Sequence, residues 1–205
     1  MTMELQKAAK VFGFIGMLGG MAQIPARFFI QPEYTGGVEG MIGWTLDAMA
    51  MLCSLFLFTG LFLVQLHKMG RFGMFSYIFL LLVTALWAGH QYGLLLLAPE
   101  LVRLDPEIML STSMPPLLFM IATLGNIALK WIAYLLFAGV SLKHRVVPRW
   151  ALILLMIGIS LDFAPMGDYL ERIVVGIAFV VLGSMLWRGI GERQDQPKAT
   201  APVAI

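Results

Sequence analysis

The chain has 205 residues, of which 60% are hydrophobic and 13% charged; its mean hydropathy is +0.85 and its formal net charge +2. A water-soluble domain of this length cannot hide so much apolar surface, so a soluble globular protein is excluded. The single cysteine, Cys53, excludes an internal disulfide and a cysteine-built metal site. Phosphate-binding loops, nucleophile elbows and basic DNA-reading stripes do not occur, so no nucleic acid is expected as a partner.

The apolar runs are long and lack the alternation of barrel strands, which predicts helices that span a lipid bilayer. In chain order, spans are predicted at about 11–30, 41–66, 72–98, 115–142, 148–164 and 169–188. We therefore expect an all-α, polytopic membrane protein with six transmembrane helices in one bundle, residues 11–188. Residues 1–10 form its predicted N-terminal segment, and the polar residues 189–205 predict a disordered tail.

Turns and small residues give further detail on the bundle. The fifth predicted span is the shortest, and residues 164–167 (APMG) form a tight turn that joins it to the sixth in a hairpin. The small residues of 16–20 (GMLGG) and Gly183-Ser184 predict close helix packing within the bundle. Dimerisation through the same faces is the alternative.

Basic residues are concentrated on the side of the predicted bundle that holds both termini. This side has three acids, Glu4, Glu192 and Asp195, and ten basic residues: Lys7, Lys10, Lys68, Arg71, Lys143, Arg145, Arg149, Arg188, Arg193 and Lys198. The opposite side has Arg27, Arg103 and Arg172 against eight acids: Glu33, Glu39, Glu100, Asp105, Glu107, Asp162, Asp168 and Glu171. Because an excess of Lys and Arg marks the cytoplasmic side, both termini are predicted to be cytoplasmic. A signal peptide ending near Pro25-Ala26 is the alternative for the start of the chain.

Lys130 is the residue most indicative of function, since it lies near the middle of the apolar run 116–142. An ammonium group inside a bilayer is costly unless a counter-charge, a carbonyl group or water meets it. Counting about 1.5 Å per helical residue puts Asp47, His90 and the Lys130 ammonium at similar depths in the outer half. The inner half offers only weakly polar residues, so we predict a polar pocket that opens outward above an apolar plug.

The candidate ligand-binding residues of this pocket are Lys130, Asp47, His90, Asn126, Arg27, Gln23 and Trp131. Lys130 is expected to anchor a small polar or anionic ligand, with Asp47 as its counter-ion in the empty pocket. His90 and Asn126 are expected to orient the ligand through hydrogen bonds. The alternative is that Lys130 and Asp47 only set helix register. Arg27 is also expected to reach the outer headgroups, and Asp168 and Arg172 are expected to form a solvated pair.

Three functions follow from this pattern. The first is the binding or passage of a small solute or ion. The second is an accessory or assembly subunit of a larger membrane complex. The third is an intramembrane enzyme for a lipid or quinone headgroup, with His90 or Lys130 as acid or base. The sequence shows no catalytic constellation or metal-ligand cluster, and it identifies no cofactor.

The segment Leu136–Gly158, with its basic turn and the Pro148-Arg149-Trp150 restart, resembles small bacterial six-helix membrane proteins of unknown function. The resemblance implies six spans and a bacterial inner membrane as the location of a multi-pass protein. It implies no activity and no functional residues.

Overall fold

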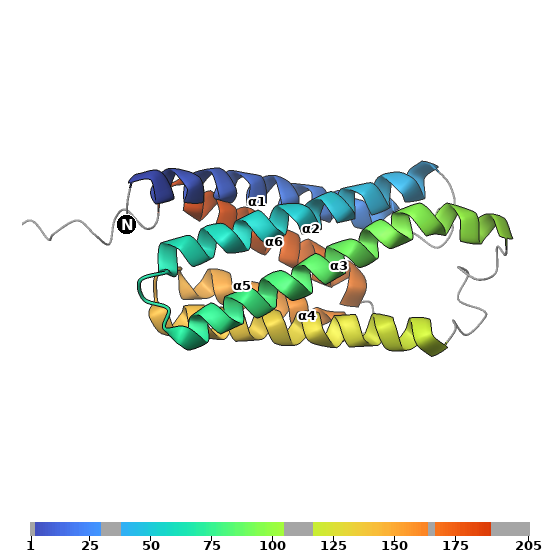
Figure 1. Ribbon diagram of the computed structural model, residues 1–205. Helices are drawn as coiled ribbons and strands as arrows, with labels where there is room; N and C mark the ends of the chain where they lie inside the picture. Colours follow the sequence, from blue (N-terminus) through green and yellow to red (C-terminus); the bar gives the residue numbers. More distant parts are fainter. Residues whose placement is uncertain (1–2, 30–37, 105–116, 164–166, 190–205) are drawn as a thin grey trace, which may run out of the picture.

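A computed structural model of the protein describes residues 3–29, 38–104, 117–163 and 167–189 (Figure 1). Every regular element in these ranges is a helix. The elements are α1 (Met3–Phe29), α2 (Val38–Gln65), α3 (Arg71–Leu104), α4 (Leu117–His144), α5 (Arg149–Ser160), the short 3₁₀ helix η2 (Leu161–Phe163) and α6 (Gly167–Trp187). The predicted tail beyond residue 189 and residues 164–166 of the predicted turn lie outside the described residues.

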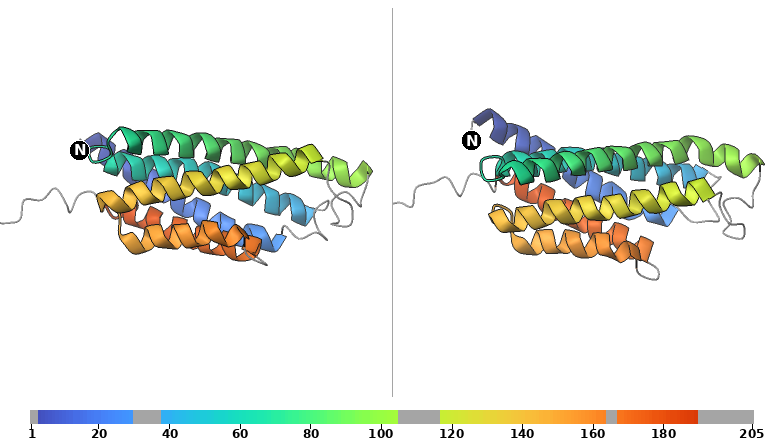
Figure 2. Two further views of the ribbon diagram at one scale, coloured as in Figure 1. Left: turned by 90° about the horizontal axis from the view of Figure 1, so that it is seen from below. Right: turned by 60° about the horizontal axis from the view of Figure 1, so that its bottom comes forward.

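The helices run alternately up and down, and each packs against its neighbours in the chain. The ring closes where α6 packs against α1, so that α1 lies between α2 and α6. Figure 2 shows that α5 is much shorter than the other helices and accompanies α6 over only part of the bundle. At about 1.5 Å per residue, its 12 residues rise about 18 Å.

Four helices contain a stretch that is long and apolar enough to cross a membrane. These stretches are Gly40–Gln65 in α2, Arg71–Leu97 in α3, Thr123–His144 in α4 and Tyr169–Trp187 in α6. The prediction of an all-helical protein with membrane-spanning helices is therefore confirmed for these four helices. The helix α5 is shorter than the roughly 30 Å of a hydrocarbon core, and α1 begins with a charged segment that includes Glu4, Lys7 and Lys10.

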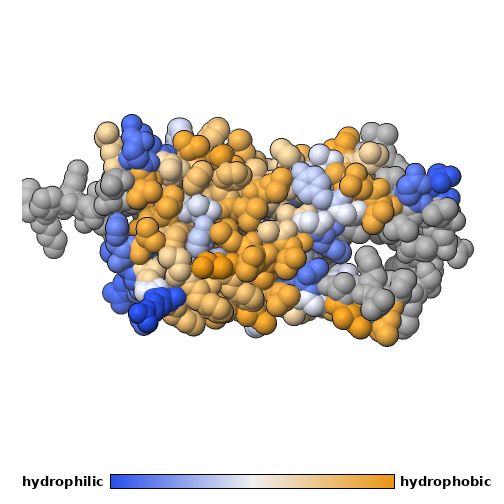
Figure 3. Space-filling view, in the orientation of Figure 1, coloured by the Kyte–Doolittle hydropathy of each residue, from blue (hydrophilic) through white to orange (hydrophobic). Residues whose placement is uncertain are grey.

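The outer surface of the bundle is apolar in its middle. Large side chains such as Leu82, Leu86, Leu124 and Ile157 are more than half exposed. Figure 3 shows apolar residues covering the middle of the visible face, with hydrophilic residues towards both ends. A surface of this kind is stable against lipid rather than water, because lipid imposes no cost on exposed leucine and isoleucine.

Close contacts between small residues hold α1 against α6. A Cβ atom on Gly20 would lie 2.5 Å from the carbonyl oxygen of Gly176, and one on Gly183 would overlap the carbonyl oxygen of Gly13. Backbones can approach this closely only where side chains are missing. The predicted packing of small residues within the bundle is therefore confirmed for α1 and α6.

Most of the described basic residues of the helix ends and turns gather at one end of the bundle, and Arg103 in the last turn of α3 lies at the other. The end with most of them contains the beginning of α1, the α2–α3 turn, the α4–α5 turn and the end of α6 (Figure 1). Two half-exposed tryptophans, Trp150 at the start of α5 and Trp187 at the end of α6, lie at the same end. Indole rings favour the boundary between lipid and water, so this end has the composition of a membrane surface. We call it the basic end.

The apolar core fills the half of the bundle near the basic end. Its centre is Phe58 of α2, which meets Tyr134, Phe137 and Phe179 edge-on at ring-centroid distances of 5.0, 5.7 and 5.6 Å. All four side chains are buried, and they come from α2, α4 and α6. Edge-on aromatic packing is favourable beyond simple burial. These four residues form the aromatic plug.

Candidate functional site

A polar cavity of about 270 Å³ lies in the half of the bundle away from the basic end. Its walls come from α1, α2, α3, α4, η2 and α6. The lining residues are Gln23, Trp44, Asp47, Met51, Trp87, His90, Gln91, Thr123, Ile127, Lys130, Asp162, Glu171 and Arg172. Figure 3 shows hydrophilic residues interrupting the apolar surface between α3 and α4 in this half.

The lengths of the helices bring these polar residues to one level. Counted from the basic end, Lys130 lies about 21 Å along α4 and Asp47 about 27 Å along α2. The short α5 ends at the same level, and η2 then turns Asp162 towards Lys130. Glu171, near the start of α6, lies about 24 Å from that helix's end. The early end of α5 is therefore what brings acidic residues to the depth of Lys130.

Lys130 is buried and held by two carboxylates. Its Nζ lies 2.7 Å from Oδ2 of Asp162 and 3.4 Å from Oε1 of Glu171. The same ammonium lies 4.5 Å from the centre of the Trp87 ring, in a cation–π arrangement. The side chains of all three charged residues are at most 10% exposed. Removal of this ammonium from water is thus compensated by two negative charges and an aromatic face.

Asp47 pairs with Arg172, which is a correction to the pairing predicted from the sequence. The carboxylate of Asp47 is fully buried and forms an ion pair with the guanidinium of Arg172 through Oδ1 and Nη1. Asp47 was expected to be the counter-ion of Lys130, and Arg172 was expected to be solvated. Arg172 can pair with Asp47 because α1 lies only partly between α2 and α6. The start of α6 therefore contacts α2 directly.

Several buried polar atoms in the cavity wall have no hydrogen-bond partner among the described residues. They include Oε1 of Gln23, Oε1 of Gln91, Oδ2 of Asp47 and Nε1 of Trp44. Gln23, Gln91 and Asp47 are at most 2% exposed. Buried polar groups are normally paired, because leaving one without a partner costs about 1–3 kcal/mol. These atoms are concentrated around one cavity and can form hydrogen bonds there.

The aromatic plug closes the cavity on the side of the basic end. Tyr134 lies one helical turn from Lys130 in that direction, and Phe58 lies further along α2 than the cavity residue Met51. Met51, Trp87 and Ala88 form a small buried cluster beside the cavity. The cavity therefore has an apolar floor towards the basic end.

The structure brings together four of the seven residues singled out in the sequence. Lys130, Asp47, His90 and Gln23 line the cavity, and the His90 ring lies 5.6 Å from that of Trp87. Asn126 is half-buried and lies outside the lining. The side chain of Arg27 lies outside the described residues.

Trp131 also lies outside the cavity lining. Its indole Nε1 donates to Oγ of Ser160 at 3.3 Å, and its ring meets Phe163 edge-on. Since Trp131 follows Lys130 in the chain, it occupies a different face of α4 and contacts the α5–η2 segment.

Asp162, Glu171 and Arg172 are the charged site residues that sequence reasoning missed, and Gln91, Trp44, Trp87 and Thr123 are further lining residues that it did not single out. The three charged residues were placed at the outer ends of the fifth and sixth spans, which made solvation the simplest interpretation. The signal that could have found them is the shortness of the fifth span, since a span that ends early leaves its last polar residues at mid-depth.

The charges of the cavity leave an excess of one negative charge. Asp47, Asp162 and Glu171 oppose Lys130 and Arg172 when all five are ionised. Within the described residues, no group of three or more His, Cys, Asp or Glu has the arrangement of a metal site. With all five groups ionised, this excess favours a small cation or a neutral hydrogen-bond donor over an anion.

Comparison with family models, with curated proteins and with solved structures gave no match to this chain.

Proposed function

We propose that this protein binds or passes a small polar solute or ion in the cavity around Lys130. The observation that carries the proposal is the concentration of buried polar atoms without hydrogen-bond partners around one cavity, in addition to its ion pairs. A purely structural ion-pair network has no need of an open space beside it. Gln23, Gln91 and Asp47 are among the groups with hydrogen-bonding capacity left for a guest, together with Trp44 and Thr123.

We favour a cation as this guest. Lys130 alone suggested an anionic ligand, but Asp162 and Glu171 neutralise it in the structure. The remaining oxygen atoms of Asp47, Gln23 and Gln91 accept hydrogen bonds or coordinate a cation, and Trp44 and Trp87 supply aromatic faces. In this proposal, Lys130 orients the two acids and sets their charge.

The proposal includes an orientation in the membrane. We infer that all six helices are embedded, with both termini cytoplasmic, in the inner membrane of a bacterium. The excess of basic residues in the helix ends and turns of the basic end supports this orientation under the positive-inside rule. The cavity then opens towards the outside, and the aromatic plug separates it from the cytoplasm.

Ligand-dependent stability tests the proposal. Purified protein would be heated in detergent with sodium, potassium or ethylammonium chloride at constant ionic strength, and the melting temperature recorded. We expect one of these cations to raise the melting temperature, because a ligand at 100 times its Kd adds about 2.7 kcal/mol to the free energy of unfolding. Gln91→Met should abolish this response, since it removes an amide that faces the cavity.

The matched control is Gln65→Met. Gln65 is also a fully buried glutamine with Oε1 lacking a partner, but it lies at the end of α2 near the basic end and outside the cavity. The control should keep the cation response of the unmodified protein. An equal loss in both variants, or a response to varied anions at fixed sodium, contradicts the cation site. No response to any salt favours the accessory-subunit alternative.

A further inference from the structure

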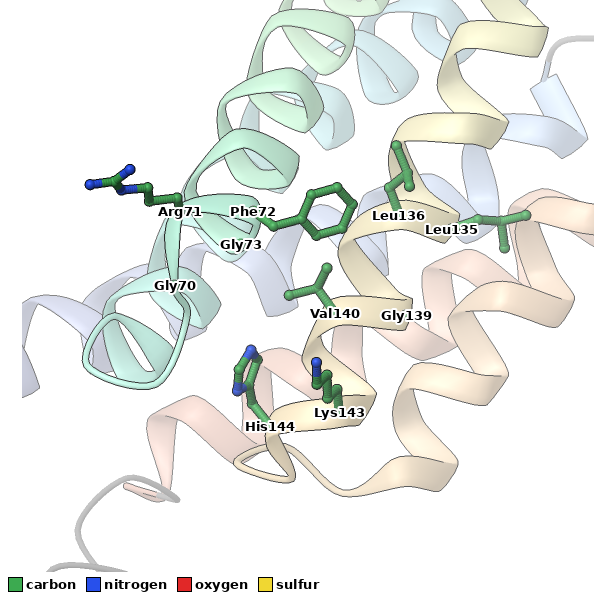
Figure 4. A pocket seen from close by; sticks show the side chains of 10 residues that line it. All are labelled: Gly70, Arg71, Phe72, Gly73, Leu135, Leu136, Gly139, Val140, Lys143 and His144. Atoms are coloured by element: carbon green, nitrogen blue, oxygen red, sulfur yellow. The ribbon is translucent and has the colours of Figure 1, made fainter.

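A second hollow lies at the basic end, between the start of α3 and the end of α4. It has a volume of about 570 Å³. Its lining is Gly70, Arg71, Phe72 and Gly73 on one side and Leu135, Leu136, Gly139, Val140, Lys143 and His144 on the other. Figure 4 shows Phe72 reaching from α3 towards Leu136 and Val140 of α4. We call this hollow the α3–α4 groove.

The α3–α4 groove is polar at one end and apolar along the rest. Lys143 and His144 project from the last turn of α4 at its lower end, whereas the side chain of Arg71 extends from α3 to the side away from α4 (Figure 4). No acidic side chain lines the groove. The first turn of α3 also contains no acid, so the positive end of its helix dipole is not neutralised there.

The apolar part of the groove is open and follows the bundle. Phe72 is 61% exposed, and a Cβ atom on Gly139 would meet no atom within 4 Å. Because Gly139 has no side chain, α4 leaves open space at this point of the groove. An extended hydrocarbon chain can lie in this space, with its charged end at Lys143 and His144.

We propose that the α3–α4 groove is a specific site for an anionic phospholipid. The phosphate of the headgroup would meet Lys143 and His144, and one acyl chain would lie along Phe72, Gly139 and Val140. Basic clusters at the ends of transmembrane helices attract anionic headgroups, and the neighbouring apolar groove distinguishes a lipid from free phosphate. The inference requires the embedding of α3 and α4 in a membrane, but it is independent of the Lys130 cavity.

Lipid binding to the full-length protein, measured by native mass spectrometry in detergent, tests the proposal. The probes are phosphatidylglycerol and phosphatidylcholine with identical acyl chains. We expect the unmodified protein to bind phosphatidylglycerol about tenfold more strongly. Lys143→Gln should reduce this preference several-fold, whereas Gly139→Leu should weaken the binding of phosphatidylglycerol by filling the path of the chain.

The matched control is Gly125→Leu on the same helix. A Cβ atom on Gly125 also meets nothing within 4 Å, but this residue lies outside the groove. The control should bind lipid as the unmodified protein does. Equal binding of both lipids, or an unchanged preference in Lys143→Gln, overturns the proposal. Displacement of the lipid by millimolar inorganic phosphate would indicate a simple anion site, and a dimer lost in Gly139→Leu would indicate an interface between copies.

Discussion

Replacing Lys130 with methionine is expected to destabilise the protein strongly, by about 3–5 kcal/mol. The substitution keeps an apolar stem of similar length but leaves Asp162 and Glu171 buried beside each other without their ammonium partner. Adding Asp162→Asn and Glu171→Gln should recover most of the loss, because the variant then buries no uncompensated charge. The measurement is the free energy of unfolding in detergent, obtained by denaturant titration.

Lys7→Met is the control for this series. Lys7 is also paired with an acid, Glu4, at 3.5 Å, but both side chains are mostly exposed. Exposed pairs contribute little, so this substitution should change stability by less than about 1 kcal/mol. If Lys130→Met were as mild as Lys7→Met, Lys130 would not be the centre of a buried ion-pair network.

The strongest energetic coupling of Asp47 should be with Arg172. Arg172→Met leaves the fully buried carboxylate of Asp47 without its cation and is expected to cost about 3–5 kcal/mol. The double variant Asp47→Asn, Arg172→Met should lose less than Arg172→Met alone. A double-mutant cycle on unfolding free energies should give a coupling energy of about 1–3 kcal/mol for this pair.

The same cycle between Asp47 and Lys130 serves as the comparison. Lys130 and Arg172 both lie in the cavity wall, but of these two only Arg172 forms an ion pair with Asp47. The coupling of Asp47 with Lys130 should therefore be clearly smaller. A larger coupling with Lys130 would restore the pairing expected from the sequence and would contradict the arrangement of α6 against α2.

The sequence was sufficient to predict the helix order and the level of the polar residues, although α1 begins at Met3 rather than near residue 11 and α3 ends at Leu104 rather than near residue 98. The predicted span 41–66 corresponds to α2 (Val38–Gln65), and the span 115–142 to α4 (Leu117–His144). An apolar run of this length is stable in lipid as an α-helix, because only a helix pairs all of its own backbone polar groups. The positions of the helices can therefore be predicted from the apolar runs. Depth follows from the helical rise, so Asp47, His90 and Lys130 were correctly expected near one another.

Partner choice could not be predicted, because it depends on rotation about each helix axis and on which helices are neighbours. Nothing in the residues near Asp47 shows that α6 packs close enough for Arg172 to reach it. Likewise, Asn126 and Lys130 are four residues apart and share a face, yet only Lys130 enters the cavity lining. The face of α4 that lines the cavity contains Thr123, Ile127 and Lys130, and Asn126 lies to one side of it.

Cysteine accessibility from either side of the membrane is the most direct test of a polar cavity that opens opposite the basic end. In a Cys53→Ala background, Thr123→Cys would place a thiol in the cavity wall, and Thr59→Cys would place one beyond it towards the basic end, beside Tyr77. The probe is a membrane-impermeant, positively charged thiol reagent, applied to spheroplasts and to inverted vesicles.

We expect the cysteine at position 123 to react in spheroplasts and to be protected in inverted vesicles, and the cysteine at position 59 to be protected in both. Reaction at position 123 only in inverted vesicles would reverse the orientation of the cavity. Protection of position 123 from both sides would contradict an open cavity.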